Sequence, residues 1–65
     1  MLRQQTAESL PAPRRKEIFH VLVVAQDLQM TVAESREMVC ERFRLNESQV
    51  REIEREGLDC CWPPL

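Results

Sequence analysis

Glycine, tyrosine and a surplus of basic residues are scarce or absent in this chain. It has one glycine and no tyrosine among 65 residues, and long stretches favour helix, so we expect an all-α fold. A chain of this length forms one small domain and buries only about 60% of the surface that its unfolded form exposes. A substrate-sized pocket is not expected beside so small a core, so we do not expect an enzyme.

The balance of charge and the lack of a long apolar run narrow the choice of partners. The chain has 9 basic and 11 acidic residues, a net charge of −2, whereas nucleic-acid-binding domains are usually basic. The most apolar run, residues 18–25, is far shorter than the roughly 20 residues that span a bilayer, and no cleavage pattern of small residues follows it. We therefore expect a cytoplasmic protein that does not enter a membrane.

The three cysteines and the single histidine form no recognisable metal or redox motif. Three thiols cannot pair completely, which favours reduced cysteines. His20, Cys40, Cys60 and Cys61 make a formal zinc set, and these four are the only candidates. Structural zinc sites place paired cysteines roughly two to four residues apart, whereas Cys60 and Cys61 are adjacent. No phosphate-binding loop or nucleotide fingerprint occurs, so no metal or cofactor is expected.

Two helix-start signals organise the middle of the chain. Thr31 is followed three positions later by Glu34, and Asn46 is followed three positions later by Gln49. Each pair has the form of a capping box, in which the two residues satisfy the free N–H groups of a helix start. Two short helices are therefore predicted, one after each signal.

The ends of these helices leave a very short turn between them. The predicted helices cover residues 32–43 and 47–56, and the second ends at Gly57 as a left-handed terminal residue. Only Arg44 and Leu45 remain for the bend before the second cap. A bend this short does not allow a relaxed hairpin, so a sharp helix crossing is predicted.

The apolar spacing across this bend is typical of a DNA-binding helix-turn-helix. Such a motif has a small residue in its first helix, apolar residues three and five positions later, and two more apolar residues on its second helix. These positions are filled in order by Cys40, Phe43, Leu45, Val50 and Ile53. Cys40 and Phe43 are therefore expected to pack at the helix crossing.

The second half of this motif resembles the promoter-reading helix in the fourth region of bacterial sigma factors. The resemblance lies in the segment LNESQVREIEREGL, which matches at Leu45, Val50, Arg51, Ile53, Glu54 and Leu58. Arg44 stands where the turn glycine is usual, and left-handed geometry at a non-glycine residue costs roughly 1–2 kcal/mol. The resemblance implies a trihelical helix-turn-helix domain that binds duplex DNA as a small bacterial transcriptional regulator.

The same resemblance implies which residues of the second helix face the DNA groove. These positions are Glu47, Ser48, Arg51, Glu52 and Arg55. Arg51 and Arg55 lie one turn apart and can reach base edges or phosphates. Residues 31–59 hold eight acidic and five basic side chains, a net charge of −3, so an isolated copy is expected to bind DNA weakly.

Three consecutive basic residues, Arg14, Arg15 and Lys16, stand at the start of a first predicted helix over residues 13–29. They are either a solvated first turn or a patch that contacts phosphates beside the helix-turn-helix. Basic side chains oppose the macrodipole at a helix N-terminus, which is a small sign of a role with a partner.

This first helix has more apolar surface than one buried face explains. Its predicted core face is made of Ile18, Val21, Leu22, Ala25 and Leu28. Phe19 and Val23 form a second stripe, which must be covered by the C-terminal tail, by a second copy of the chain or by another partner. His20 lies among these residues and is expected to be a partly exposed structural histidine.

The predicted three-helix domain covers residues 13–58, between a flexible arm at 1–12 and an extended tail at 59–65. The tail either folds back over the second stripe of the first helix or serves as a docking peptide. The alternative function is therefore a protein-interaction module that binds a protein partner or a second copy. The residues of that alternative surface are Phe19, Val23, Trp62 and Leu65.

Overall fold

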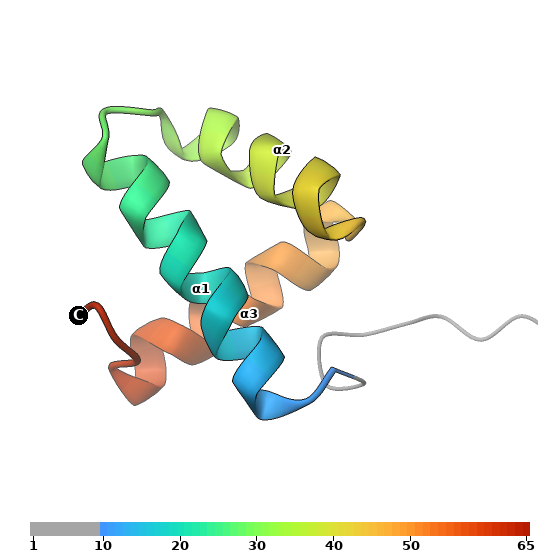
Figure 1. Ribbon diagram of the computed structural model, residues 1–65, viewed down its shortest axis with the longest axis vertical. Coiled ribbons are helices and arrows are strands. Elements are labelled where there is room, and N and C mark those ends of the chain that lie inside the picture. The colour runs from blue at the N-terminus through green and yellow to red at the C-terminus, as the bar shows by residue number, and fades with distance from the viewer. Residues whose placement is uncertain (1–9) are drawn as a thin grey trace, which may run out of the picture.

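The fold is known from a computed structural model, which describes residues 10–65 as helices packed around one small core (Figure 1). The helices are α1 (Ala12–Asp27), α2 (Val32–Phe43) and α3 (Glu47–Cys60). No strand occurs in the part of the chain that the structure describes, so the predicted all-α, three-helix fold is confirmed. Residues 1–9 of the predicted arm lie outside the described part of the chain, and Ala12, which was placed in the arm, is the first residue of α1.

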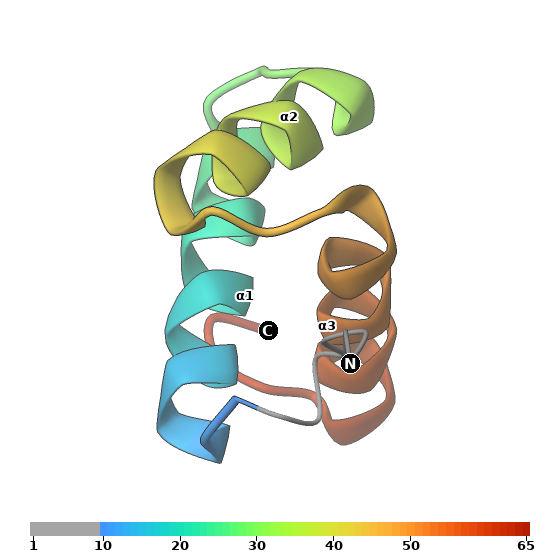
Figure 2. The same cartoon turned by 90° about the vertical axis from the view of Figure 1, so that its right-hand side faces the viewer.

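The helices form a compact triangle. Figures 1 and 2 show α3 crossing α1, with α2 laid over one end of the pair. The two short links between helices, residues 28–31 and 44–46, leave little freedom in this arrangement. The core therefore lies where the inner faces of all three helices meet.

Both predicted capping boxes are present. The hydroxyl of Thr31 accepts a hydrogen bond from the Glu34 N–H at 3.0 Å, and the Glu34 carboxylate accepts from the Thr31 N–H at 2.9 Å. Asn46 and Gln49 make the same reciprocal pair at 2.8 Å and 2.9 Å. These local bonds fix the N-termini of α2 and α3, where the sequence predicts them.

The turn between α2 and α3 uses left-handed backbone at a residue other than glycine. Arg44 has φ 56° and ψ 50°, so the turn keeps the geometry for which glycine is usual. The N–H groups of Arg44 and Leu45 both donate to the carbonyl of Cys40, the second at 2.9 Å. The prediction of a two-residue bend is therefore confirmed.

The predicted end of α3 at Gly57 is wrong. The helix continues to Cys60, and Cys61 takes the left-handed conformation that ends it, with φ 52°. Gly57 is buried inside the helix against the ring of Phe19. Because Gly57 has no side chain, α1 and α3 can approach each other closely at this point. Asp59 and Cys60, which were placed in an extended tail, belong to α3.

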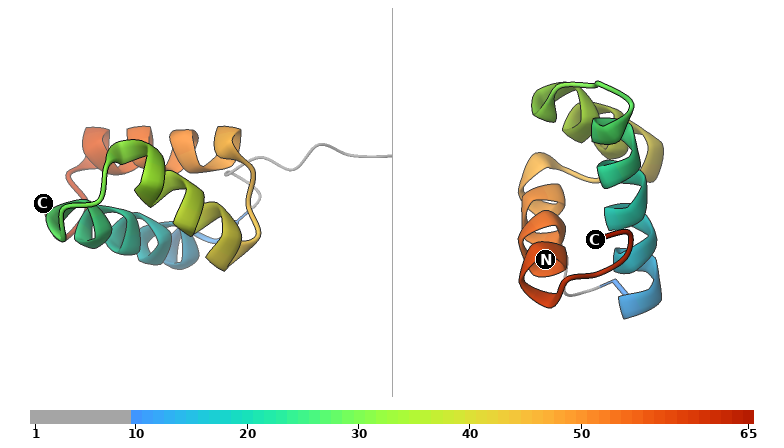
Figure 3. Two further views of the ribbon diagram at one scale, coloured as in Figure 1. Left: turned by 90° about the horizontal axis from the view of Figure 1, so that it is seen from above. Right: turned by 90° about the vertical axis from the view of Figure 1, so that its left-hand side faces the viewer.

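The C-terminal residues turn back onto α1, as Figure 3 shows. The N–H of Trp62 donates to the carbonyl of Gly57 at 3.0 Å, which starts this return. The Trp62 ring then meets the Phe19 ring edge to face, with 6.1 Å between centroids. The expected fold-back is thus confirmed for Trp62, whereas Leu65 is 59% exposed and covers nothing.

The buried face of α1 is rotated from the predicted one. Phe19, which was placed off the core, is fully buried together with Ile18 and Leu22. Val21 and Leu28 were both placed in the core, but Val21 is only half-buried and Leu28 is 72% exposed. This rotation follows from the contacts of Phe19 with α3 and with the tail. The helix α1 also ends at Asp27, earlier than the predicted residue 29, so Leu28 lies just beyond it.

The crossing of α2 also differs from the prediction. Cys40, Phe43 and Leu45 are only half-buried, while Ser35 is completely buried. The Ser35 hydroxyl accepts a hydrogen bond from the Gln26 amide at 3.1 Å and donates to the Val32 carbonyl at 2.8 Å. Ser35 is therefore a small buried residue where α2 meets α1, while Cys40, Phe43 and Leu45 pack against the core from half-buried positions.

Candidate functional site

Four of the predicted groove-facing residues, Glu52 among them, lie along one exposed face of α3. Ser48, Arg51 and Arg55 are exposed at intervals of three and four residues, which is the spacing of a single helix face. Within the described residues, neither Arg51 nor Arg55 takes part in an ion pair or a side-chain hydrogen bond. Both side chains are exposed on the surface of α3.

An open hollow of about 450 Å³ lies beside these two arginines. Its wall includes Arg36 from α2, which the sequence reasoning did not select. Arg36 is held there by Glu54, whose carboxylate accepts hydrogen bonds at 2.7 Å and 3.1 Å. The sequence did contain a sign of this ion pair, because Arg36 and Glu54 carry opposite charges on two helices that were predicted to cross.

The acidic residues of α3 are not equivalent. Arg36 neutralises Glu54, and Arg15 neutralises Glu56 through two hydrogen bonds of 2.9 Å and 3.1 Å. Glu47 is exposed and adds negative charge to the helix that carries Arg51 and Arg55, and Glu52 is exposed on the same helix. The local field at α3 is therefore less acidic than the sequence count suggests, but it is not basic.

The basic cluster of α1 is largely engaged within the molecule. Arg15 bonds Glu56 and also donates to the backbone carbonyl of Leu10. Arg14 pairs with Glu17 at 2.9 Å and lies over the Phe43 ring, 4.9 Å from its centroid.

Lys16 completes the basic cluster, and its ammonium lies 5.9 Å from the centroid of the Trp62 ring. All three basic side chains thus make contacts that hold α1 to the rest of the fold. These contacts favour a structural role for Arg14, Arg15 and Lys16 over a role in contacting phosphates.

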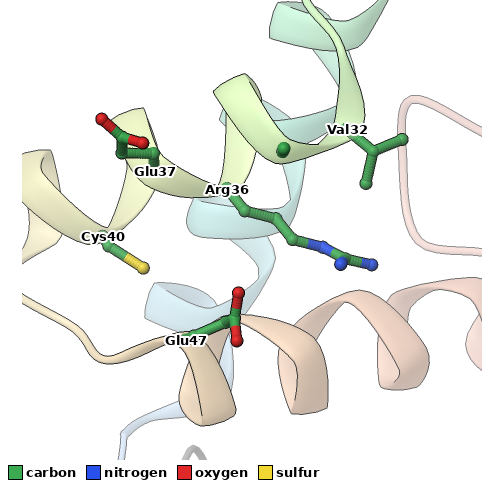
Figure 4. Close-up of a pocket in the computed structure, with 6 residues that line it drawn as sticks. Val32, Arg36, Glu37, Cys40 and Glu47 are labelled. Carbon is green, nitrogen blue, oxygen red and sulfur yellow. The ribbon is translucent and has the colours of Figure 1, made fainter.

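A second hollow, of about 570 Å³, separates α2 from α3 (Figure 4). Figure 4 shows the Cys40 thiol and the Glu47 carboxylate pointing toward each other across it, while Glu37 points away from α3. Burial raises the pKa of the Cys40 thiol, and the negative charges of Glu47, Glu37 and Glu41 raise it further. Cys40 is therefore a protonated and weakly reactive thiol near neutral pH.

No cluster of three or more His, Cys, Asp or Glu side chains within residues 10–65 is placed to hold a metal ion. Cys40, Cys60 and Cys61 are all free thiols. His20 is exposed on α1, as expected.

Of the four residues predicted to form the surface of the alternative function, only Leu65 is exposed. Phe19 and Trp62 are buried against each other, so neither can dock a partner, and Val23 is half-buried. The other large apolar side chains that are exposed among the described residues are Val24 and Leu28 on α1, Val32 on α2 and Leu58 on α3. The sequence reasoning missed the exposure of Leu28 because it assigned this residue to the core.

Comparisons of the chain with protein-family models, with curated proteins and with solved structures found no match. Among the described residues, no helix is both long and apolar enough to cross a membrane.

Proposed function

We propose that this chain is a helix-turn-helix DNA-binding module of the transcription-regulator class. The observation that carries the proposal is the pair Arg51 and Arg55 on the exposed face of α3, free of internal partners within the described residues. Arginine in this setting can donate two parallel hydrogen bonds to guanine or bind a phosphate.

The fold supports this use of α3. The left-handed turn at Arg44 lets α3 begin at a sharp angle to α2, and the Asn46 cap fixes its first turn. Ser48 stands exposed in that first turn, where a hydroxyl can contact a phosphate or a base edge. A helix held in this way can enter a major groove without any rearrangement of the core.

The acidic residues set the expected strength of binding. Phosphate neutralisation provides most of the non-specific affinity, and α3 offers only Arg51 and Arg55 for it while Glu47 repels the backbone. Binding by one copy should therefore be weak, and two phosphate contacts predict only a shallow fall of affinity with salt.

Fluorescence anisotropy with a labelled random duplex at low salt tests this proposal. Arg51→Gln and Arg55→Gln should each weaken binding and each reduce the salt slope by about 0.9, the value for one lost phosphate contact. Arg14→Gln is the matched control, because it removes the same charge from a side chain that is paired with Glu17. Equal losses in all three variants, or none in any, would refute the assignment to α3.

A second candidate, a protein-interaction module, is favoured by one specific observation. Leu28 is 72% exposed and Val24 is 36% exposed. Both line a hollow between α1 and α2 to which no residue of α3 contributes. Large exposed apolar side chains gathered in one place are typical of interaction surfaces. This use of the fold does not compete with DNA binding, because no residue of α3 lines that hollow.

A further inference from the structure

Two adjacent thiols stand at the point where α3 ends. Cys60 is the last residue of the helix and Cys61 is its cap, and both are exposed and free. Trp62, the next residue along the chain, is buried against the ring of Phe19. The two thiols are therefore accessible to solutes and directly joined to a residue that covers the core.

The cap at Cys61 and the docking of Trp62 depend on the same stretch of backbone. Cys61 has φ 52° and ψ 46°, and its N–H donates to the carbonyls of Gly57 and Leu58. The N–H of Trp62 also donates to the carbonyl of Gly57, at 3.0 Å. A change in the backbone torsions between Cys60 and Cys61 therefore opens the cap and moves Trp62 at the same time.

This geometry keeps the two thiols from joining each other. A disulfide between neighbours closes a small ring that contains their peptide bond, so it restricts ψ of Cys60 and φ of Cys61. With helical ψ at Cys60 and positive φ at Cys61, the two β-carbons lie on opposite sides of that peptide plane. Neighbouring α-carbons are also only about 3.8 Å apart, whereas those of an ordinary disulfide are about 4.4–6.8 Å apart. The ring can therefore close only after the cap opens.

We propose that Cys60 and Cys61 form a redox switch, in which a peroxide oxidises the pair to a disulfide and thereby opens the cap of α3 and releases Trp62. One thiolate attacks a peroxide oxygen, which gives a sulfenic acid and releases hydroxide that becomes water. The other thiolate then displaces hydroxide from the sulfenic sulfur, so the S–S bond forms and a second water is released. A dithiol reductant restores both thiols by exchange and is itself oxidised to a disulfide.

Oxidation of the pair and docking of Trp62 oppose each other. Closing the ring requires the Trp62 ring to leave Phe19, and by linkage the docked ring favours the dithiol to the same extent. A strained disulfide is also the kind that is easily reduced again, which a switch requires. The folded chain therefore keeps the pair reduced until a strong oxidant is present. The proposal extends beyond DNA binding and does not rest on it.

Fluorescence of the full chain reports the release directly, because Trp62 is the only tryptophan. Dilute protein is treated with hydrogen peroxide, and its intact mass and emission spectrum are measured together. We expect a monomer that has lost two hydrogens and whose emission lies at longer wavelength, and dithiothreitol should reverse both changes. Cys61→Ser is the matched control, because it keeps Cys60 but cannot close the ring, so its emission should not shift.

Three results of this experiment would overturn the proposal. The first is a closed ring with unshifted emission, and the second is an equal shift in Cys61→Ser. The third is a different disulfide in peptide mapping, either between two copies of the chain or to Cys40.

A redox titration in glutathione buffer measures the coupling to Trp62. The ratio of disulfide to dithiol at Cys60 and Cys61 should be at least tenfold higher in Trp62→Ala than in the parent, which corresponds to about 1.4 kcal/mol. This expectation holds whether or not the variant folds, since an unfolded chain also lacks the docked ring. Leu65→Ala is the matched control in the same segment, because Leu65 is 59% exposed. Equal ratios in Trp62→Ala and the parent, or an equal rise in Leu65→Ala, would show that the pair is not coupled to Trp62 and would refute the switch.

Discussion

The ring of Phe19 lies directly over the α-carbon of Gly57, so that a β-carbon at that position would come within 2.2 Å of the ring. This contact joins the middle of α1 to the last turns of α3. Because glycine alone permits it, the helices approach more closely there than ordinary side chains would allow. The return of the chain at Trp62 then closes the remaining side of the ring.

Gly57→Ala should therefore destabilise the protein, although alanine is the better helix former by about 1 kcal/mol. Overpacking of a core typically costs about 1–3 kcal/mol, and here the clash is with a completely buried ring. Denaturant unfolding followed by circular dichroism measures the change. In a Phe19→Leu background, the same substitution should cost clearly less, and equal costs in both backgrounds would show that the ring is not the obstacle.

Trp62→Ala should remove a large part of the stability of the domain. Trp62 is 8% exposed and packs on Phe19, and truncation of a buried aromatic residue costs about 3–5 kcal/mol. So small a domain has little stability to lose, so the variant should be mostly unfolded near 37 °C. Leu65→Ala is the control in the same segment, and it should change the melting temperature very little because Leu65 is 59% exposed.

Arg44→Gly should stabilise the protein. The left-handed conformation of Arg44 costs a non-glycine residue roughly 1–2 kcal/mol, and the greater freedom of unfolded glycine offsets part of the gain. We expect a net increase of about 0.5–1 kcal/mol in the free energy of unfolding. Arg44→Ala should bring no such gain, and an alanine variant as stable as the glycine variant would point to the lost charge as the cause.

The thiols should differ in their reaction with iodoacetamide. The raised pKa keeps the Cys40 thiol protonated at pH 8, so Cys40 should react slowly, and its rate should rise as pH passes above the usual cysteine range. Cys60 and Cys61 are exposed and should be modified first. Mass spectrometry of peptides from a timed reaction measures the order. Modification of Cys40 ahead of the other two would contradict its placement between α2 and α3.

Local signals in the sequence predicted much of this fold. The two capping boxes depend on residues three positions apart, and they placed the starts of α2 and α3 correctly. Periodicity was enough to predict three helices and an all-α fold. The short bend between α2 and α3 followed from the two-residue interval between Phe43 and the Asn46 cap.

The errors came from contacts between distant parts of the chain. Gly57 looks like a helix end by its local properties, and its role became clear only with Phe19 against it. The same contact turns α1 so that Leu28 faces out. Ser35 is buried because Gln26 provides a hydrogen-bond partner, a pairing that sequence spacing does not indicate.

The candidate DNA-binding face was easier to predict than its surroundings. Exposure of Ser48, Arg51 and Arg55 follows from the helical period of α3 alone, once Val50 and Ile53 are placed in the core. The ion pairs of Arg15 with Glu56 and of Arg36 with Glu54 needed the packing of three helices. Charge counted along the sequence therefore overstated the acidity of α3.

The central claim, that α3 binds duplex DNA through Arg51 and Arg55, is tested most directly by a salt titration. The affinity of the parent chain for a random duplex should be measured from low to physiological ionic strength. Two neutralised phosphates per copy predict that log Kobs falls against log[salt] with a slope of about −2. Failure to bind at the lowest salt, or binding that does not change with salt, would contradict the claim.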